Sequence, residues 1–166
     1  NHVIAAEALT KSLSYMVVSK KSKLKEAFKN LSGNEIKQLS QKKGKAFITE
    51  TVQQNILGYS GDTPVEDYER WENVDVLIHE ATFLNNEVGL NNHANKHSNL
   101  EDVMKMVSEI KIGKLILSHF SSRYSKEEID DAIVQQCKTL KIDIPVYRVL
   151  PGEKSFDILN GEPVNS

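Results

Sequence analysis

Three apolar runs in this chain each end in polar, titratable residues, and this repeated pattern constrains the fold more than any other feature. The runs lead into Ser60-Gly61-Asp62-Thr63, His79-Glu80-Ala81-Thr82 and Ser118-His119-Phe120-Ser121-Ser122-Arg123-Tyr124. Short apolar runs bounded by turn residues are typical of buried strands. We therefore expect three strands that release functional groups at their carboxyl ends.

Helices are expected to alternate with these strands. Ser98-x-x-Glu101 and Ser125-x-x-Glu128 have the form of capping boxes, and each is followed by apolar residues at helical spacing. Two further strands are expected over Val146–Leu150 and Ser155–Leu159, on either side of the turn residues Pro151-Gly152. Alternating strands and helices predict an α/β sheet covered by helices, with ligands beyond the carboxyl ends of the strands.

A lysine-rich segment, residues 19–51, differs from the rest of the chain. Between Ser19 and Lys45 there are nine lysines and two glutamates, a local charge of +7 in a chain whose formal net charge is -2. The pattern predicts a strand over residues 13–18, a helix over Lys23–Leu31, a brief turn near Ile36, and an extended piece over Ala46–Thr51. We interpret the segment as a basic excursion from the core.

Composition indicates one globular domain. The chain has 166 residues, 39% hydrophobic and 27% charged, and no apolar run approaches the roughly 18 residues that span a bilayer. The single cysteine, Cys137, excludes an internal disulfide and lies on an apolar stripe, so we expect a buried thiol. The chain begins at Asn1 without a secretory leader, which makes a cytoplasmic location the expectation.

Together with His97-Ser98, the three polar segments resemble ribonuclease Z, the tRNA 3′-end endonuclease of the metallo-β-lactamase superfamily. The resemblance is strongest from Asn55 to Tyr124. It implies an α/β fold corresponding to the C-terminal half of a metallo-β-lactamase-type αββα sandwich. That half would be a mixed sheet with helices on one face, extended by a basic protruding arm.

The resemblance also implies a site with two zinc ions. Asp62 would bridge the metals, His119 would bind one of them, and His2 would bind the other. Imidazole and carboxylate are ordinary zinc ligands, and zinc activates water near neutral pH. His97 would protonate the departing ribose 3′-oxygen, with Glu80 holding its imidazole.

Arg123 would hold a phosphate of the substrate with help from the Ser121 hydroxyl, and the lysine-rich arm would bind precursor tRNA by neutralising phosphates. His79 is expected to be structural and His93 to be a loop residue. The family's His-x-His-x-Asp-His motif is absent from these residues. We therefore expect the isolated chain to be inactive unless an N-terminal half, or another chain, completes the site. A homodimer and the absence of membrane contact are also expected.

Each of these roles has a plain structural alternative. Asp62 stands in a Gly-Asp-Thr-Pro turn, the histidines could order loops, Arg123 could be a solvated charge, and the lysines could cover a surface helix. Two other functions stay open. One is hydrolysis of a small phosphodiester such as a cyclic nucleotide, and the other is a non-catalytic RNA-binding or subunit-pairing module.

Overall fold

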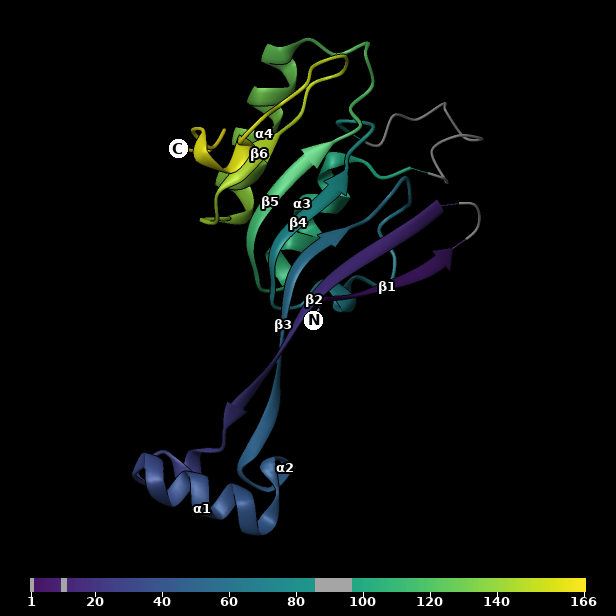
Figure 1. The fold of residues 1–166 in the computed structure, drawn as a ribbon. Helices are drawn as coiled ribbons and strands as arrows, with labels where there is room; N and C mark the ends of the chain where they lie inside the picture. Colours follow the sequence, from purple (N-terminus) through teal and green to yellow (C-terminus); the bar gives the residue numbers. More distant parts are fainter. Residues whose placement is uncertain (1, 10–11, 86–96) are drawn as a thin grey trace.

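A single mixed sheet organises the chain (Figure 1). The computed structural model describes residues 2–9, 12–85 and 97–166, with side chains described from Ser12 onward. Within these residues six strands lie in sequence order: β1 His2–Leu9, β2 Ser12–Leu24, β3 Thr49–Tyr59, β4 Val74–Glu80, β5 Ile112–Ser118 and β6 Val146–Arg148. The pairs β1–β2 and β2–β3 are antiparallel, whereas the strands from β3 to β6 pair parallel.

Two helices, α3 over Leu100–Glu109 and α4 over Lys126–Leu140, cover one face of the sheet. Leu77 of β4 and Leu115 of β5 belong to the same buried cluster as Val103, Met104 and Ile133 of the helices. Alternate residues of each strand therefore point toward the helices, as expected for a strand with a period of two. The α/β class, with a mixed sheet and helices on one face, is confirmed.

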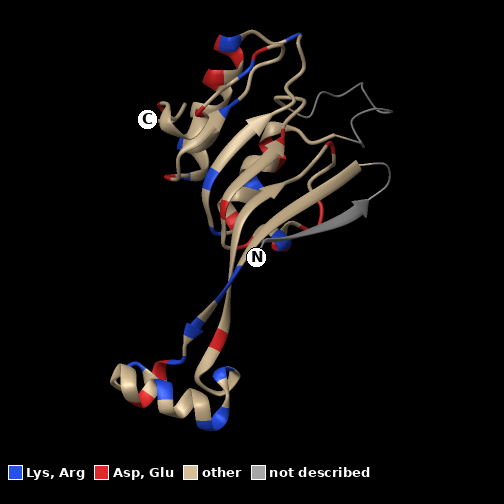
Figure 2. Cartoon of the chain, in the orientation of Figure 1, with Lys and Arg blue, Asp and Glu red and all other residues tan. Residues whose placement is uncertain are grey.

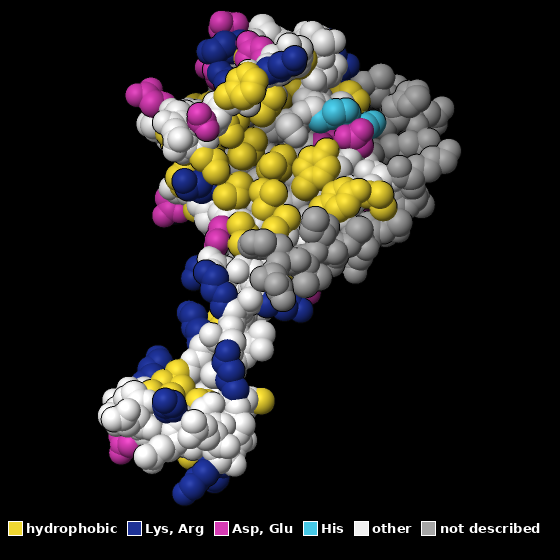
Figure 3. All heavy atoms as spheres, in the orientation of Figure 1, with side chains coloured by type: hydrophobic (Ala, Val, Ile, Leu, Met, Phe, Trp, Pro, Cys, Tyr) yellow, Lys and Arg dark blue, Asp and Glu magenta, His cyan; other side chains and the backbone are white. Residues whose placement is uncertain are grey.

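The opposite face of the sheet is apolar and has no helix over it among the described residues. Cross-strand pairing places five side chains in one row: Tyr15, Tyr59, Ile78, Ile116 and Tyr147. The rings of Tyr15 and Tyr59 stack at 6.3 Å, and both are more than a third exposed. Figure 3 shows hydrophobic side chains gathered across this face. No helix within the described residues is long and apolar enough to cross a membrane.

The basic arm is a two-stranded stalk with a helical tip (Figure 1). Its stalk is the far half of the β2–β3 pair, where Lys20 to Leu24 face Gln53 to Thr49. Its tip contains the 3-10 helix η1 over Glu26–Phe28, α1 over Gly33–Lys43 and α2 over Lys45–Ile48. Figure 2 shows basic residues along both parts.

A small cluster at the tip holds these helices together. The rings of Phe28 and Phe47 lie 5.7 Å apart, the Lys43 ammonium sits 4.6 Å from the Phe47 ring, and Ile48 is buried. The protruding basic arm that the resemblance implied is therefore observed.

Several sequence-based boundaries in the arm were wrong. Lys23–Leu31 is not a helix, because β2 continues to Leu24 and only the short η1 follows. The long helix is α1, where we expected a brief turn. Ser32 caps it, in a capping box with Glu35, and this local pair starts a helix despite the adjacent Gly33. Ala46–Thr51 is extended only from Thr49 onward.

Other boundaries differ near the ends of the sheet. Asn99, not Ser98, caps α3 by accepting a hydrogen bond from the amide of Asp102, whereas the Ser125–Glu128 capping box of α4 is confirmed. Ser155–Leu159 forms no strand; the 3-10 helix η4 spans Ile158–Asn160 instead. A further 3-10 helix, η2, spans Tyr68–Trp71 before β4. Cys137 is buried as expected, and burial raises the pKa of its thiol to about 11.

Candidate active site

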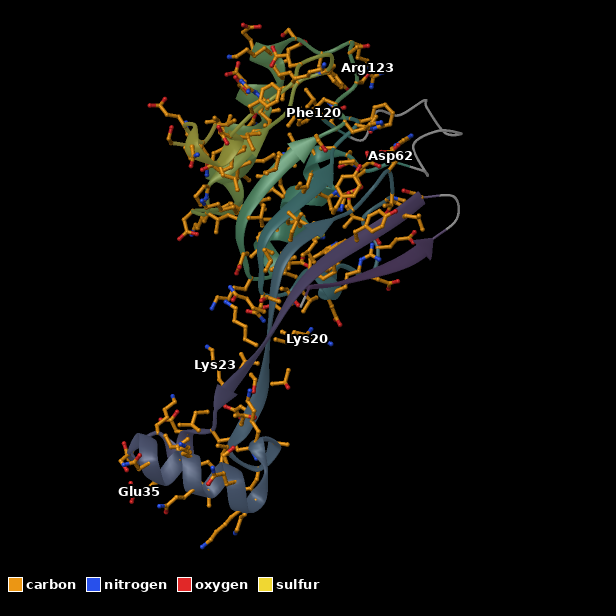
Figure 4. All side chains as sticks on the ribbon, in the orientation of Figure 1. Lys20, Lys23, Glu35, Asp62, Phe120 and Arg123 are labelled. Atoms are coloured by element: carbon orange, nitrogen blue, oxygen red, sulfur yellow. The ribbon has the colours of Figure 1, made fainter. Side chains whose placement is uncertain are left out.

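The carboxyl ends of β3, β4 and β5 meet at one edge of the sheet, because the three strands are parallel neighbours. This arrangement brings Asp62, Glu80 and His119 to the same edge, although they are far apart in the sequence. The closest approach of Asp62 to His119 is 3.5 Å, between Asp62 Oδ2 and His119 Nε2. About half of each of these side chains is exposed. Figure 4 shows Asp62 at this end of the sheet, opposite the arm.

Unusual backbone conformations place both side chains. Gly61, which precedes Asp62, has a φ of +67°, and a Cβ atom there would lie 2.5 Å from the carbonyl oxygen of Leu13. Only glycine fits that turn. His119 follows β5 with a φ of 62°, a left-handed conformation that costs a non-glycine residue roughly 1 kcal/mol or more. Such strain is typical of functional sites.

The buried Glu80 pairs with the partly exposed His97 beside these two residues. His97 Nδ1 lies 3.2 Å from Glu80 Oε1, and only 2% of the Glu80 side chain is exposed. Burial raises the pKa of the Glu80 carboxyl, although hydrogen bonding from Thr82 and the nearby His97 imidazole act to lower it. Because a carboxylate can only accept, His97 donates from Nδ1 and keeps Nε2 available for another partner.

The two histidine rings stack on each other, with centroids 5.4 Å apart and an angle of 23° between their planes. The rings of Phe83 and His97 pack edge to face, with centroids 6.5 Å apart and an angle of 84° between their planes. The structure therefore forms one contiguous group of two imidazoles and two carboxylates. These are groups suited both to metal binding and to proton transfer.

The donor set fits a divalent metal, and two combinations of ligands are possible. Among the described residues, atoms of Glu80, His97 and His119 all lie within 4.8 Å of one another. However, the Nδ1 atoms of both histidines already make hydrogen bonds, to Glu80 and to Thr82. We favour the pair of His119 Nε2 and Asp62 Oδ2, because these atoms face each other and both side chains are about half exposed.

Thr82 is a residue of this site to which the sequence analysis gave no role. Its hydroxyl lies 2.6 Å from Glu80 Oε2 and 2.9 Å from His119 Nδ1. The residue stands in the quoted His79-Glu80-Ala81-Thr82 segment. From the sequence, Thr82 can be placed only as a residue that follows a strand. Its contact with His119 arises because β4 and β5 are paired.

Arg123 lies beside the group through aromatic contacts. Its guanidinium is stacked 5.1 Å from the Phe83 ring and 4.8 Å from the Tyr124 ring, and it donates a 2.7 Å hydrogen bond to the Tyr124 hydroxyl. Ser121 is fixed by its backbone, which donates to the carbonyl of Thr82 at 2.9 Å. Both predicted phosphate ligands are thus on the loop that follows His119, and their phosphate role stays a prediction.

The other histidines are placed differently. His2 lies in β1 opposite Ser19, which pairs with Gln54, five residues before the end of β3. At 3.3 Å per residue this is about 16 Å from the carboxyl edge, so the register does not bring His2 to Asp62 and His119. Because β1 is antiparallel to β2, it runs in the same direction as β3, and His2, its first residue, lies away from the carboxyl end. The His2 side chain lies outside the described residues. His93 lies outside them as well.

His79 points away from the group and is buried, as expected for a structural residue. Its Nδ1 donates to the carbonyl oxygen of Glu80 at 2.7 Å. Desolvation lowers the pKa of His79 to about 4. The hydrogen bond to Glu80 acts to raise this pKa, and the positive charge of Arg70 acts to lower it further.

The left-handed backbone at His119 gives a stability prediction. We expect His119→Gly to have a free energy of unfolding about 0.5–1 kcal/mol above that of His119→Ala, since both variants lack the imidazole and only alanine keeps the strain. The greater flexibility of glycine in the unfolded chain offsets part of the gain. Urea unfolding of the two variants measures the difference, and equal or lower stability of the glycine variant would contradict it.

Sequence comparisons identify relatives of this chain. It is 34% identical over 139 residues to tRNase Z TRZ1 of Arabidopsis thaliana, a match covering 80% of this chain and 46% of the relative. It is 32% identical over 116 residues to ribonuclease Z of Staphylococcus aureus strain MRSA252, covering 69% of this chain and 37% of the relative. The chain thus spans less than half the length of these curated relatives. No family model matches it.

Solved structures with partial similarity carry related names. The metallo-beta-lactamase fold protein YhfI from Bacillus subtilis aligns with a TM-score of 0.47 at 16% identity, covering 83% of this chain and 48% of that one. A long form RNase Z from yeast aligns with a TM-score of 0.38 at 26% identity, covering 69% and 12%. Superpositions at these scores are partial, so the relationship depends on the sequence matches.

The observed sheet, helices and arm define an α/β protein with a mixed sheet, helices on one face among the described residues, and a protruding basic arm. Within that class its similarity is to ribonuclease Z, over 69–81% of this chain in the matches to the plant and Staphylococcus aureus enzymes. The resemblance indicated by the polar segments is confirmed, and this chain is similar to the C-terminal half of that enzyme.

Proposed function

We propose that this chain carries half of the active site of a zinc-dependent endoribonuclease that removes the 3′ trailer of precursor tRNA. The observation that supports this most strongly is the convergence of Asp62, Glu80, His97 and His119 on one sheet edge, with 3.5 Å between Asp62 and His119 and 3.2 Å between Glu80 and His97. Relatives named ribonuclease Z and tRNase Z support the substrate class.

Asp62 and His119 would hold zinc through Oδ2 and Nε2, a carboxylate and imidazole pair that suits this metal. Bound zinc would supply Lewis acidity toward water and the phosphodiester. Two zinc ions need more ligands than these residues offer, and the His-x-His-x-Asp-His motif is absent from the 166 residues. We infer that a segment bearing that motif completes the site.

His97 would act as the general acid that protonates the departing ribose 3′-oxygen. The buried Glu80 carboxylate accepts a hydrogen bond from His97 Nδ1 and so fixes the direction of Nε2. Arg123, stacked on Phe83 beside the His97 ring, would bind a neighbouring phosphate with Ser121. The stacking restricts the guanidinium before substrate arrives.

The apolar sheet face gives the completing segment a place to pack. Tyr15, Tyr59 and Ile78 lie in register there and continue toward Ile116 and Tyr147. Burying such a face contributes roughly 25 cal/mol per Å² of apolar surface. An N-terminal half of the same enzyme would cover it, and a homodimer and a cytoplasmic location are part of the same proposal.

The function is tested by assaying cleavage in two contexts. The chain is incubated with zinc and a precursor tRNA carrying a 3′ trailer, alone and with a ribonuclease Z segment that bears the His-x-His-x-Asp-His motif. We expect no cleavage by the chain alone, and cleavage at the 3′ end of the tRNA when the segment is present. Parallel assays use bis(p-nitrophenyl) phosphate.

The same experiment separates the alternatives. Hydrolysis of only the small ester would reject the tRNA substrate and favour a small-phosphodiester hydrolase. If metal analysis of the same two samples found no bound zinc in either, the chain would be an RNA-binding or subunit-pairing module. The arm favours a large substrate, because a small ester gains nothing from basic residues remote from the site (Figure 2).

The arm gives a salt-dependence prediction. Lys20, Lys21 and Lys23 are exposed on the stalk, and Figure 4 shows Lys20 and Lys23 projecting from it. Replacing all three by glutamine should weaken tRNA binding and lower the slope of log K against log salt by about 2 to 3, since each phosphate contact contributes about 0.9.

Binding titrations over a range of salt concentrations measure this slope. A matched control replaces three exposed lysines of the globular part by glutamine, Lys105, Lys111 and Lys138, and should leave the slope unchanged. An equal effect of the two triple variants would mean that the arm has no special part in binding.

A further inference from the structure

The hydroxyl of Thr82 lies between the two halves of the candidate site. It is 2.6 Å from Glu80 Oε2 and 2.9 Å from His119 Nδ1, and 3.5 Å from His97 Nδ1. Thr82 is buried, and its carbonyl oxygen accepts from the amide of Ser121, two residues beyond His119. Both the side chain and the backbone of Thr82 therefore contact the segment that carries His119.

Counting hydrogens assigns a direction to each of these bonds. A threonine hydroxyl has one hydrogen to donate and two lone pairs, and a carboxylate has only acceptors. The hydroxyl hydrogen therefore goes to Glu80 Oε2, at the shorter distance. A lone pair of the same oxygen is then left to accept from His119 Nδ1.

This direction determines which ring nitrogen of His119 carries the proton. If Nδ1–H donates to Thr82, a neutral imidazole has no hydrogen on Nε2. Nε2 is the atom that faces Asp62 Oδ2 at 3.5 Å. The nitrogen turned toward the exposed carboxylate is thus the one with a free lone pair, which is what a metal requires.

We propose that Thr82 is a positioning residue that fixes the Nδ1–H tautomer of His119 and joins this histidine to Glu80. Through Glu80 Oε2 and Oε1 the same chain of bonds reaches His97 Nδ1, so one hydroxyl connects the residue proposed to bind metal with the residue proposed to donate a proton. The tautomer assignment stands on geometry alone, whereas its consequence for catalysis rests on the proposed function.

The test compares Thr82→Val, which removes the hydroxyl and keeps the shape, with Thr82→Ser, which keeps the hydroxyl. Long-range ¹⁵N–¹H NMR of the imidazoles distinguishes the tautomers in the metal-free protein, at a pH about two units above the usual histidine pKa of about 6.5. We expect His119 to be Nδ1–H in the unmodified protein and in Thr82→Ser. In Thr82→Val, we expect a mixture with Nε2–H.

A second readout is zinc affinity, measured by competition with a chelating dye. Loss of a hydrogen bond behind a metal-binding histidine typically costs 10–100-fold in affinity. We expect about that loss in Thr82→Val and near-complete rescue in Thr82→Ser. A purely structural role would lower the melting temperature of the valine variant without changing the tautomer.

Two results would overturn the proposal. One is an Nε2–H tautomer of His119 in the unmodified protein, which decides the matter even if Thr82→Val does not fold. The other is a folded Thr82→Val protein with an unchanged tautomer and unchanged zinc affinity. Failure of the proposed nuclease function is a separate outcome, because it would appear as an absence of tRNA cleavage while the NMR result stood.

Discussion

Replacing His97 by glutamine should lower the rate of precursor-tRNA cleavage about 10³-fold, in the protein completed by a segment bearing the missing motif. A positioned general acid typically contributes 10²–10⁴-fold, and glutamine can still accept or donate a hydrogen bond but cannot transfer the proton. The loss should appear in kcat, with little change in KM, since tRNA binding depends on the arm. Single-turnover cleavage of a labelled precursor tRNA measures it.

Glu80→Gln should have a smaller effect of about 10- to 100-fold, because glutamine still offers an oxygen to His97 but no negative charge. Glu101→Gln is the matched control: Glu101 is an exposed carboxylate in the first turn of α3 and should leave the rate unchanged. A His97→Gln protein with the full rate would remove this histidine from the mechanism. Circular dichroism of each variant verifies that it is folded.

The free energy of unfolding should fall by about 3 kcal/mol as the pH is lowered from about 6.5 to about 4, through His79 alone. Burial lowers the pKa of His79 from 6.5 to about 4, so between these values the unfolded chain binds a proton that the folded chain excludes. Above pH 6.5 the imidazole is neutral in both states and contributes no pH dependence. Each unit of pKa difference corresponds to about 1.4 kcal/mol.

His79→Asn is the comparison, because its amide can replace the Nδ1–H donor to the Glu80 carbonyl without titrating. Urea unfolding of both proteins from pH 4 to pH 8 measures the difference. Both keep Glu80, whose raised pKa acts in the opposite sense, so subtracting the two curves isolates His79. Parallel curves for the two proteins would show that His79 is not the group responsible.

Much of the fold and the site followed from local pattern. The three polar segments after apolar runs predicted the meeting of Asp62, Glu80 and His119, because parallel neighbouring strands must end at the same edge. The Ser125–Glu128 capping box located the start of α4 correctly. These features depend on a few adjacent residues and on one general rule of sheet geometry.

What the sequence did not predict depends on distant contacts. Ser155–Leu159 has the alternation of a strand, but no strand among the described residues pairs with it, and its Phe156 is 85% exposed. His2 pairs with Ser19, but the sequence of apolar and polar residues in these two strands is compatible with several pairing registers. Thr82 gained its role only where β4 and β5 bring its hydroxyl to His119, which no spacing along the chain reveals.

The two-stranded stalk separates the energetics of the arm from those of the sheet. Among the described residues, those of β2 from Lys20 to Leu24 pair on one side only, whereas β4 and β5 have neighbouring strands on both sides and helices against one face. A lone ribbon of this kind is marginally stable in water, so it opens by local fluctuation at a fraction of the domain's unfolding free energy. We therefore expect the basic tip to reorient on the proposed tRNA substrate while the geometry of the sheet end stays fixed.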